Sequence, residues 1–369
     1  MLTPYRAQRT AHAPRRRAAW SVVTAGVCAA TLVLAGCSGD DPAETPTPTT
    51  EVTPGATADK VAPPAPAVPP SWPLTGVAAS DVVARPALAV KIENSKEARP
   101  QTGLENADVV WEEMVEGGVT RYIAVYHSQV PETVGPIRSV RPMDSNIIAP
   151  LRGLMAFSGG QPGFVQSVSD VGLQVLSHDG GASGFYRSGD RRAPHNVYGT
   201  LATFLSQADA EHSAPPAPEF VFARDPAQAT AVVAGAPTNV VSITMSRYSQ
   251  PSWTWDGASG SFQRSESGAP AVSAAGVRLA AKNVVVMSMA MYDTGTVDPA
   301  GSPVPETEVV GTGPALVATG GMSIAATWSK ASPADPFVLT AADGTPVRLA
   351  PGGTWVELVP TTSGSFSTS

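Results

Sequence analysis

Two segments of the chain concentrate side chains that could hold an anionic group. Both are rich in Gly and Pro and are predicted to be loops: 135–141, with Asp144 close behind it, and 186–196. Converging guanidinium groups bind carboxylate or phosphate through paired hydrogen bonds. In a chain of net charge −7, this concentration of arginine predicts a site for an anionic ligand. The candidate binding residues are Arg138, Arg141, Arg187, Arg191, Arg192 and Asn196.

A structural role for the same arginines is the competing interpretation. Arg138 or Arg141 would then pair with Asp144 or Asp190, and the stretch 187–195 would only hold a long loop in place. One observation separates the two interpretations. Side chains that converge on a cavity favour ligand binding, and internally paired side chains favour the structural role.

His195, between Pro194 and Asn196, is the candidate catalytic residue. It could act as a general base, with Asp190 or Asp144 orienting its ring. A lone histidine in a loop is more often a donor to backbone carbonyls, which is the alternative. The serine hydrolase motifs Gly-x-Ser-x-Gly and Ser-x-x-Lys are absent from the sequence, and the spacing of His127, His178 and His195 predicts no metal site. We therefore expect no metal or cofactor and favour a protein that is not an enzyme.

Two further features have both a chemical and a structural interpretation. Glu112 and Glu116 could serve glycoside hydrolysis, which needs carboxyl groups about 5–9.5 Å apart. A surface ion pair with Arg121 is the interpretation we favour for them. Trp253 and Trp255 fall on one face of a predicted strand, where they could form a platform for carbohydrate or pack in the core. Core packing is favoured.

The N-terminus predicts export and lipidation. Five arginines and no acidic residue precede an apolar run that ends in Leu34-Ala35-Gly36-Cys37. This pattern is typical of a lipoprotein signal peptide over 1–36, whose removal leaves Cys37 as a diacylated, and further palmitoylated, N-terminus. Two acyl chains anchor a protein stably to a membrane. The hydrophobic residues expected after a twin-arginine pair are missing behind Arg15–Arg17, so Sec export is favoured; the alternative for Cys37 is a buried residue at the end of a signal-anchor helix.

Composition excludes several classes of function. Removal of 1–36 leaves 19 basic against 31 acidic residues, with no basic stripe, so a nucleic-acid partner is not expected. Cys28 and Cys37 are the only cysteines, which excludes a disulfide or a cysteine nucleophile from the mature domain. The expected partners are membrane lipid, through acylated Cys37 on the outer face of the cytoplasmic membrane, and a cell-wall polymer or another envelope protein.

Patterning predicts an α+β fold in two parts. Nine prolines over 38–71 indicate a disordered spacer over 37–71 behind the lipidated cysteine. A mixed α/β domain over 72–212 is predicted to pack on a β-rich domain over 219–360, followed by a polar tail over 361–369. Helices are expected over 164–171, over 196–209 with Thr200 as N-cap, and over 226–234. Strands are expected over 87–92, 154–157, 240–245, 252–256, 262–265, 284–291, 323–328, 337–340 and 355–359.

The clearest local signal is a β-hairpin over 109–127. Two apolar runs flank Gly117-Gly118, which favours a two-residue turn that places Glu112 opposite Ile123 and Trp111 opposite Ala124. Trp111, Tyr122 and Tyr126 are then expected on one core-facing side. A helix over 107–116 is the competing assignment.

Several uncommon strings occur together in the order found in one family. They include Arg99-Pro100-Gln101-Thr102-Gly103, Gly135-Pro136-Ile137-Arg138-Ser139-Val140-Arg141, Arg191-Arg192-Ala193-Pro194-His195-Asn196 and Pro351-Gly352-Gly353-Thr354-Trp355. The chain after the spacer resembles the YerB-like bacterial lipoproteins, whose two modules are domains of unknown function. The resemblance implies a two-part, extracytoplasmic, membrane-tethered protein and no particular reaction. We therefore expect a lipoprotein that binds an envelope component or an exported protein; the alternative is a hydrolase that acts on an envelope polymer through His195.

Overall fold

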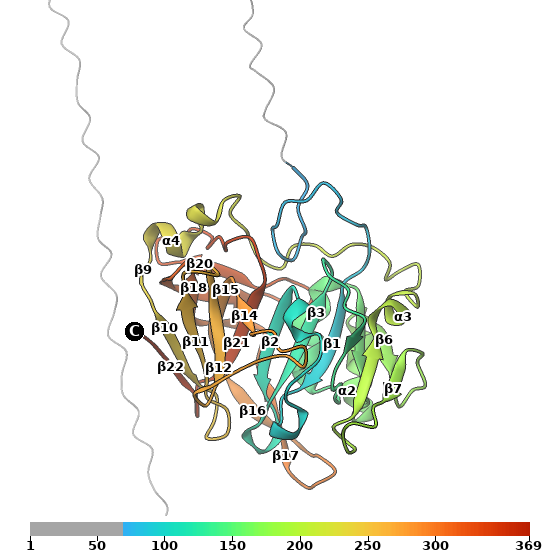
Figure 1. The fold of residues 1–369 in the computed structure, drawn as a ribbon. Helices are drawn as coiled ribbons and strands as arrows, with labels where there is room; N and C mark the ends of the chain where they lie inside the picture. The colour runs from blue at the N-terminus through green and yellow to red at the C-terminus, as the bar shows by residue number, and fades with distance from the viewer. Residues whose placement is uncertain (1–68) are drawn as a thin grey trace, which may run out of the picture. The chain divides into compact units, whose positions relative to one another are not determined.

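The computed structural model describes residues 69–369, which are dominated by strands, with few and short helices (Figure 1). Cys37, the predicted signal peptide and nearly all of the predicted spacer lie outside the described residues. Contacts place the described residues in one compact unit, Pro66–Ser369. None of the helices within 69–369 is long and apolar enough to cross a membrane.

Within the described residues, an 11-stranded sheet forms the centre of the fold. Its strands in spatial order are β20 (Val338–Ala341), β19 (Met322–Lys330), β18 (Gly311–Thr319), β15 (Asn283–Met289), β21 (Thr354–Pro360), β2 (Val109–Met114), β3 (Thr120–Tyr126), β1 (Leu88–Glu93), β5 (Leu154–Phe157) and β6 (Gln174–Ser177), with β9 (Ala236–Pro237) paired to β19. The two halves of the chain meet where β2 and β21 pair in parallel, with Glu112 opposite Glu357. The two predicted parts therefore share one sheet, and the boundaries 72–212 and 219–360 stay a prediction.

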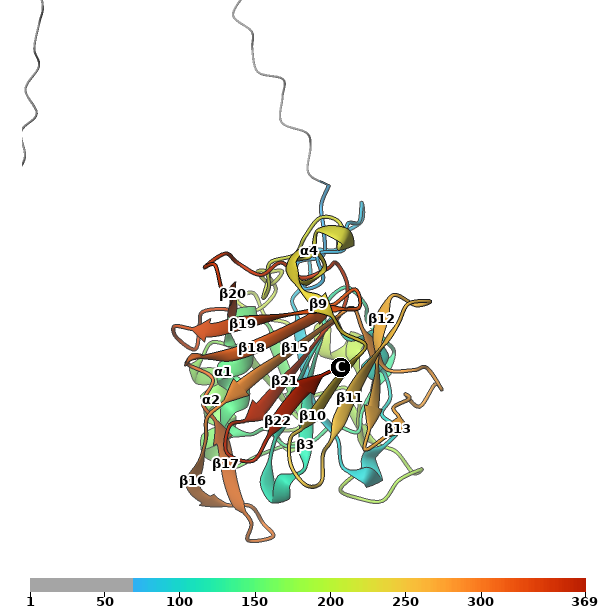
Figure 2. The same cartoon turned by 90° about the vertical axis from the view of Figure 1, so that its left-hand side faces the viewer.

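A second sheet covers one face of the main sheet (Figure 2). It is built from β13 (Ala269–Pro270), β12 (Ser261–Glu266), β11 (Pro251–Asp256), β10 (Val240–Thr244) and β22 (Ser365–Thr368), with β14 (Ala280–Ala281) paired to β12. Trp253 and Phe262 of this sheet share a core with Val284 and Trp355 of the main sheet. The favoured core packing is confirmed for Trp253, which is fully buried, while Trp255 is half-buried against the same core.

Helices cover the opposite face of the main sheet. Met143 of α1 (Pro142–Ile148) and Val168 of α2 (Pro162–Asp170) share a second core with Trp111 and Val285. The main sheet is thus buried on both faces, which explains the nearly continuous apolar runs in β1, β15 and β21. The remaining elements are β4 (Thr133–Val134), β7 (Phe185–Arg187), β8 (Val197–Thr200), β16 (Met291–Val297), β17 (Pro303–Thr307), α3 (Leu201–Leu205), α4 (Thr230–Ala234) and the 3₁₀ turns η1 (Lys96–Ala98), η2 (Leu104–Asn106), η3 (Glu116–Gly118), η4 (Ala149–Leu151) and η5 (Pro226–Gln228).

The predicted hairpin over 109–127 is present, but its register was predicted wrongly by one residue. Glu112 lies opposite Tyr122, where Ile123 was expected. The turn is the 3₁₀ segment η3, in which Gly117 has φ +68° and Gly118 has φ +77°, so it is longer than a two-residue turn. Both glycines occupy the left-handed region that residues with a Cβ rarely adopt.

A slip of one residue exchanges the two faces of a strand. Tyr122 and Tyr126 therefore lie in the core on the opposite side of the sheet from Trp111, contrary to the prediction. Arg121 lies opposite Glu113 and shares the helix-covered side with it, whereas Glu112 faces the second sheet. Because the predicted register put these charged residues on the wrong faces of the sheet, their partners in other elements could not be predicted.

Other elements agree with the sequence patterns to differing degrees. Of the three expected helices, α2 is observed close to its predicted bounds. The expected helix over 196–209 is strand β8 followed by the short α3, and Thr200 makes no side-chain cap there. The expected helix over 226–234 is interrupted at Ala229 between η5 and α4. The tail over 361–369 is in part strand β22, which pairs with β10 through four residues.

Candidate functional site

An open cleft of about 490 Å³ brings together three arginines from two neighbouring segments of the chain. We call it the arginine cleft and define it by Arg121, Arg138 and Arg141. Arg121 comes from the start of β3, and the other two lie between β4 and α1. Its remaining lining residues are Glu116, Ser139, Gly160, Gln161, Asp179, Asp298, Pro299 and Ala300.

One carboxylate serves two of the three guanidinium groups. Arg141 pairs with both oxygens of Glu116 and donates from Nη2 to Oε2 at 2.8 Å. The nearest nitrogen of Arg121 lies 3.9 Å from the same Oε2, while its Nη1 donates to the backbone oxygen of Ser139 at 2.7 Å. Glu116 therefore neutralises Arg141 well and Arg121 only in part.

Arg138 is held more loosely than the other two. Its side chain is 25% exposed, and its Nε lies 3.5 Å from Oε1 of Glu93 without a hydrogen bond to any described residue. Glu93 also accepts a hydrogen bond from Ser95 at 3.0 Å and contacts His195. The guanidinium of Arg138 is thus the arginine of the cleft most free to contact a ligand.

Arg121 and Arg141 of the cleft are both buried and lie close to each other. Burial and the neighbouring Arg141 lower the pKa of Arg121 to about 9, with a further lowering from Arg138 and a partial opposing effect of Glu116. A lowered arginine pKa means that the charged form lacks solvation and sufficient counter-charge. A bound anion would supply that charge.

The two residues just before α2 also line the cleft. Gly160 and Gln161 line it, and within residues 69–369 neither of their backbone N–H groups has an acceptor. A Cβ on Gly160 would lie 2.6 Å from the side chain of Val140, so this close approach requires glycine. Backbone N–H groups without an acceptor are available to donate to an anion.

The remaining predicted binding residues lie elsewhere. Arg187 is exposed and donates to Asn196 at 2.8 Å. Arg191 donates to the backbone oxygens of Glu97 and Pro100 at 2.6 and 2.7 Å, so it holds a loop in place as the structural interpretation expects. Arg192 is exposed and does not line the cleft. The predicted set of arginines is therefore divided between a cleft and a loop anchor.

The predicted carboxylate partners of His195 are wrong. Asp190 is exposed and bonds to Ser188 at 3.0 Å, and Asp144 is fully buried in α1, 2.8 Å from Nζ of Lys91. Asp144 was expected in a loop; in α1 its Oδ2 accepts the backbone N–H of Arg141 at 2.9 Å. The observed partner is Glu93, whose Oε1 lies 2.8 Å from Nδ1 of His195.

Sequence reasoning missed Arg121, Glu116, Glu93 and Gly160 as parts of this site. Glu112 and Glu116 also do not form a carboxylate pair, because Glu112 is fully buried beside Arg264 and Glu116 holds Arg141. With the correct hairpin register, Arg121 would have been predicted on the helix-covered side of the sheet, where Arg141 lies next to α1. No short-range signal connects Glu93 with His195, which are 102 residues apart.

Two segments of the chain match the two domains of one protein family. Residues 74–214 match the N-terminal domain, and residues 241–356 the C-terminal domain, of the family described as "Protein of unknown function (DUF3048)". The chain belongs to this family, whose description states no activity.

Two similar proteins come from Bacillus subtilis. The "Putative lipoprotein YerB" of strain 168 is 36% identical over 128 residues, which are 34% of this chain and 39% of that protein. The crystal structure of the YerB protein from Bacillus subtilis superposes with a TM-score of 0.68 at 25% identity, over 80% of this chain and 99% of that chain. The resemblance to the YerB-like family that the motifs predicted is confirmed.

Proposed function

We propose that this protein is a membrane-tethered, extracytoplasmic binding lipoprotein that holds the phosphate or carboxylate groups of an envelope component in the arginine cleft. The observation that carries the proposal is the meeting of Arg121, Arg138 and Arg141 in one cleft, where only Arg141 has a close carboxylate partner, Glu116. A cell-wall polymer or an acidic segment of an exported protein would supply the anionic group.

Charge and geometry support binding over a purely structural role. Arg141 is satisfied by Glu116, but Arg138 and Arg121 are each more than 3.4 Å from their nearest carboxylate oxygen. A tetrahedral phosphate or planar carboxylate between them would accept paired hydrogen bonds from both guanidinium groups. Asp179 and Asp298 also line the cleft.

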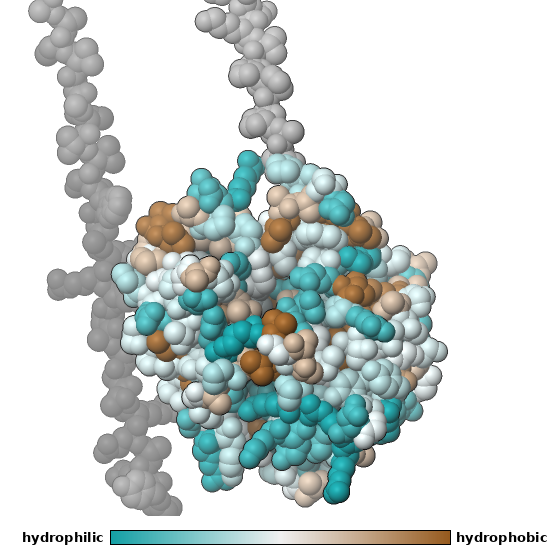
Figure 3. All heavy atoms as spheres, in the orientation of Figure 1, coloured by the Kyte–Doolittle hydropathy of each residue, from teal (hydrophilic) through white to brown (hydrophobic). Residues whose placement is uncertain are grey.

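The size and surroundings of the cleft suit a small polar group on a larger molecule. About 490 Å³ lies within the range of ordinary ligand pockets. On the face shown in Figure 3, hydrophobic residues gather in small separate groups among hydrophilic ones, without a broad apolar surface. A polar ligand site in the cleft is therefore favoured over an apolar docking surface on this face.

Replacing Arg138 with glutamine is expected to weaken phosphate binding by about tenfold or more, because a charge-assisted hydrogen bond contributes about 1.5–3 kcal/mol. Binding of inorganic phosphate and of acetate is measured calorimetrically at constant ionic strength, and a pull-down with isolated cell walls tests the polymer. The side chain of Arg138 is partly exposed, so the variant should fold.

The matched control is Arg192→Gln, which removes an exposed arginine outside the cleft. Equal loss of affinity in both variants would show that only the net charge of the protein matters, and it would contradict the proposal. Tighter binding of phosphate than of acetate would indicate a phosphate-bearing polymer, and the reverse order an acidic protein segment.

A hydrolase acting on an envelope polymer is the second candidate, favoured by the contact of His195 with the buried Glu93. The 2.8 Å contact could orient the ring of His195 as a general base. Wild type and His195→Ala are compared in a cell-wall digestion assay. We expect neither to digest the wall; digestion by wild type that His195→Ala abolishes would replace binding with hydrolysis.

The tether itself is tested at Cys37. The predicted acylation site lies outside the described residues, and the similarity to a protein named as a lipoprotein supports it. Cys37→Ala is expected to release the protein from membranes or to leave the uncleaved precursor, because no thiol remains for the diacylglycerol. A Cys37→Ala protein of mature size that stays in the membrane fraction would contradict lipid anchoring.

A further inference from the structure

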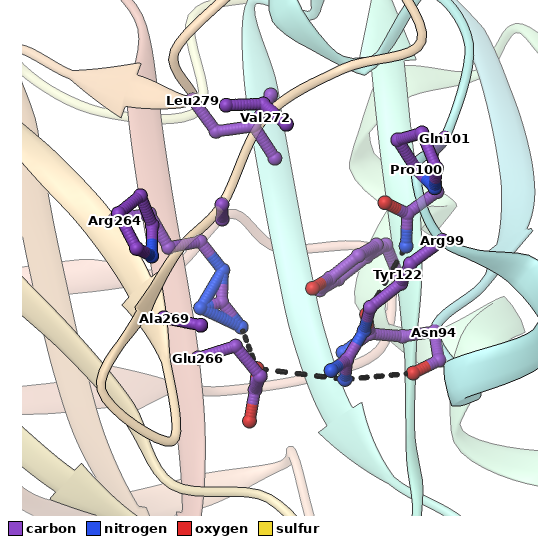
Figure 4. Close-up of a pocket in the computed structure, with 12 residues that line it drawn as sticks. Asn94, Arg99, Pro100, Gln101, Tyr122, Arg264, Glu266, Ala269, Val272 and Leu279 are labelled. Atoms are coloured by element: carbon purple, nitrogen blue, oxygen red, sulfur yellow. Dashed lines mark hydrogen bonds and ion pairs between the residues drawn. The ribbon is translucent and has the colours of Figure 1, made fainter.

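A second, smaller cavity of about 250 Å³ lies between the two modules of the chain (Figure 4). Asn94, Arg99 and Gln101 line it from the segment that follows β1, and Arg264 and Glu266 line it from β12. The other lining residues are Pro100, Tyr122, Ala269, Pro270, Ala271, Val272 and Leu279. None of these residues lines the arginine cleft.

The guanidinium of Arg264 lines this cavity with unused donors. Arg264 is fully buried, and its Nη2 donates to Glu112 at 2.6 Å and to Glu266 at 3.0 Å. Within the described part of the chain, its Nε and Nη1 have no hydrogen-bond partner. A buried donor without a partner is costly, so a ligand acceptor placed here would be favoured.

The charges around Arg264 are already balanced. Arg264 and Arg99 both approach Glu266, at 3.0 and 3.6 Å, and Glu112 supplies the second negative charge. Burial and the neighbouring Glu112 raise the pKa of Glu357 well above its ordinary value, which favours its neutral form. A charged ligand beside Arg264 would have no counter-charge, and burying an unpaired charge is unfavourable in free energy. A neutral ligand is therefore favoured.

The other lining groups complement a small amide. The Nε2 of Gln101 is held by Glu93 and Asn94, at 3.1 Å from each, which leaves its oxygen as an acceptor that points into the cavity (Figure 4). Val272 and Leu279 form an apolar end of the same cavity (Figure 4). Arg264 thus offers donors to a carbonyl oxygen, Gln101 an acceptor to an N–H group, and the apolar end a place for a methyl group.

We propose that this cavity binds a neutral acetamido group, with the carbonyl oxygen on Arg264, the N–H toward Gln101 and the methyl group between Val272 and Leu279. The group could come from an N-acetylated sugar or from an N-acetylated peptide. The site lies apart from the arginine cleft and does not depend on the function proposed for that cleft.

Ligand-detected NMR with N-acetylglucosamine tests the proposal, with glucose and glucosamine as comparison probes. N-acetylglucosamine is expected to bind with a dissociation constant on the order of 1 mM, typical of a ligand of this size. Its acetyl methyl should receive the strongest saturation transfer, because it is the part enclosed by apolar side chains. N-acetylalanine methylamide, used in parallel, distinguishes a peptide source from a sugar source.

Two substitutions fill the cavity without touching Arg264. Ala269→Leu and Val272→Phe enlarge exposed lining residues, and each is expected to weaken binding at least tenfold. Ala258→Leu, in the exposed turn between β11 and β12, is the matched control and should bind as wild type does. Circular dichroism and the thermal unfolding midpoint serve as the folding check and should stay close to those of wild type in all three variants.

Either of two results would overturn the proposal. Glucose or glucosamine binding as well as N-acetylglucosamine would show that the acetamido group is not recognised. Unchanged N-acetylglucosamine binding in both cavity-filling variants would place the ligand elsewhere. Binding of only the acetylated peptide would support the acetamido site and exclude a sugar source.

Discussion

Replacing Lys91 with methionine is expected to lower the free energy of unfolding by about 3–5 kcal/mol, because two buried carboxyl groups would lose their cation. Nζ of Lys91 lies 2.8 Å from Oδ1 of Asp144 and also pairs with Glu113, and all three side chains are fully buried. Burial and the neighbouring Asp144 raise the pKa of Glu113, so its charged form in particular depends on the lysine. Chemical denaturation at neutral pH measures the effect.

The same substitution should also weaken phosphate binding in the arginine cleft. Asp144 holds Lys91 through one oxygen and the backbone N–H of Arg141 through the other, so its displacement would move Arg141. Lys96→Met, which removes an exposed lysine three residues from β1, is the control and should change stability by less than about 0.5 kcal/mol. A Lys91→Met protein as stable as this control would show that the buried triad has no net role.

Replacing Arg264 with methionine is expected to cost a similar 3–5 kcal/mol, measured in the same way. Arg264 is the cation that holds Glu112 at 2.6 Å and Glu266 at 3.0 Å, and it lies over the rings of Tyr122, Trp253 and Trp355. Methionine would keep part of the apolar contact but leave Glu112 unpaired inside the protein. Arg224→Met, at an exposed arginine, is the matched control.

Glu357 makes this cluster sensitive to pH. Its pKa is raised in the folded protein, so the folded state keeps a proton that the unfolded state releases above about pH 4.5. Stability is therefore lost as the pH rises from that value toward the folded-state pKa. Glu357→Gln retains the acceptor for the Trp253 indole and removes this loss, so it should be more stable than wild type at pH 8 and closer to it at pH 5. Equal differences at both pH values would contradict a protonated Glu357.

Local patterns predicted the elements whose cause is local. Glycines at 117 and 118 between β-branched runs predicted a hairpin, and the periodicity around Val168 predicted α2. The hairpin register failed because the 3₁₀ turn has one residue more than the predicted turn, and a single residue decides which face each side chain occupies. Strand β22 was missed because a short polar edge strand has no apolar alternation to reveal it.

Only the part of the candidate site that lies within one short segment could be predicted from the sequence. Arg138 and Arg141 lie in one short segment, and their types alone indicated anion binding. Arg121 and Glu116 join them through the hairpin register, and Gly160 through the packing of α2, neither of which is encoded within a few residues. The predicted partners of His195, Asp190 and Asp144, were wrong, and Glu93 could be identified only from the fold.

The parallel pairing of β2 with β21 joins residues 109–112 to residues 354–357. Contacts between segments so far apart in the chain raise the contact order, and high contact order slows folding. During synthesis the inner edge of β2 has no partner until nearly the whole chain has emerged, so the nascent protein carries an open sheet edge for most of that time. If the two family modules are expressed as separate polypeptides, one exposes the edge of β2 and the other the edge of β21. Each module should then self-associate unless the two are produced together.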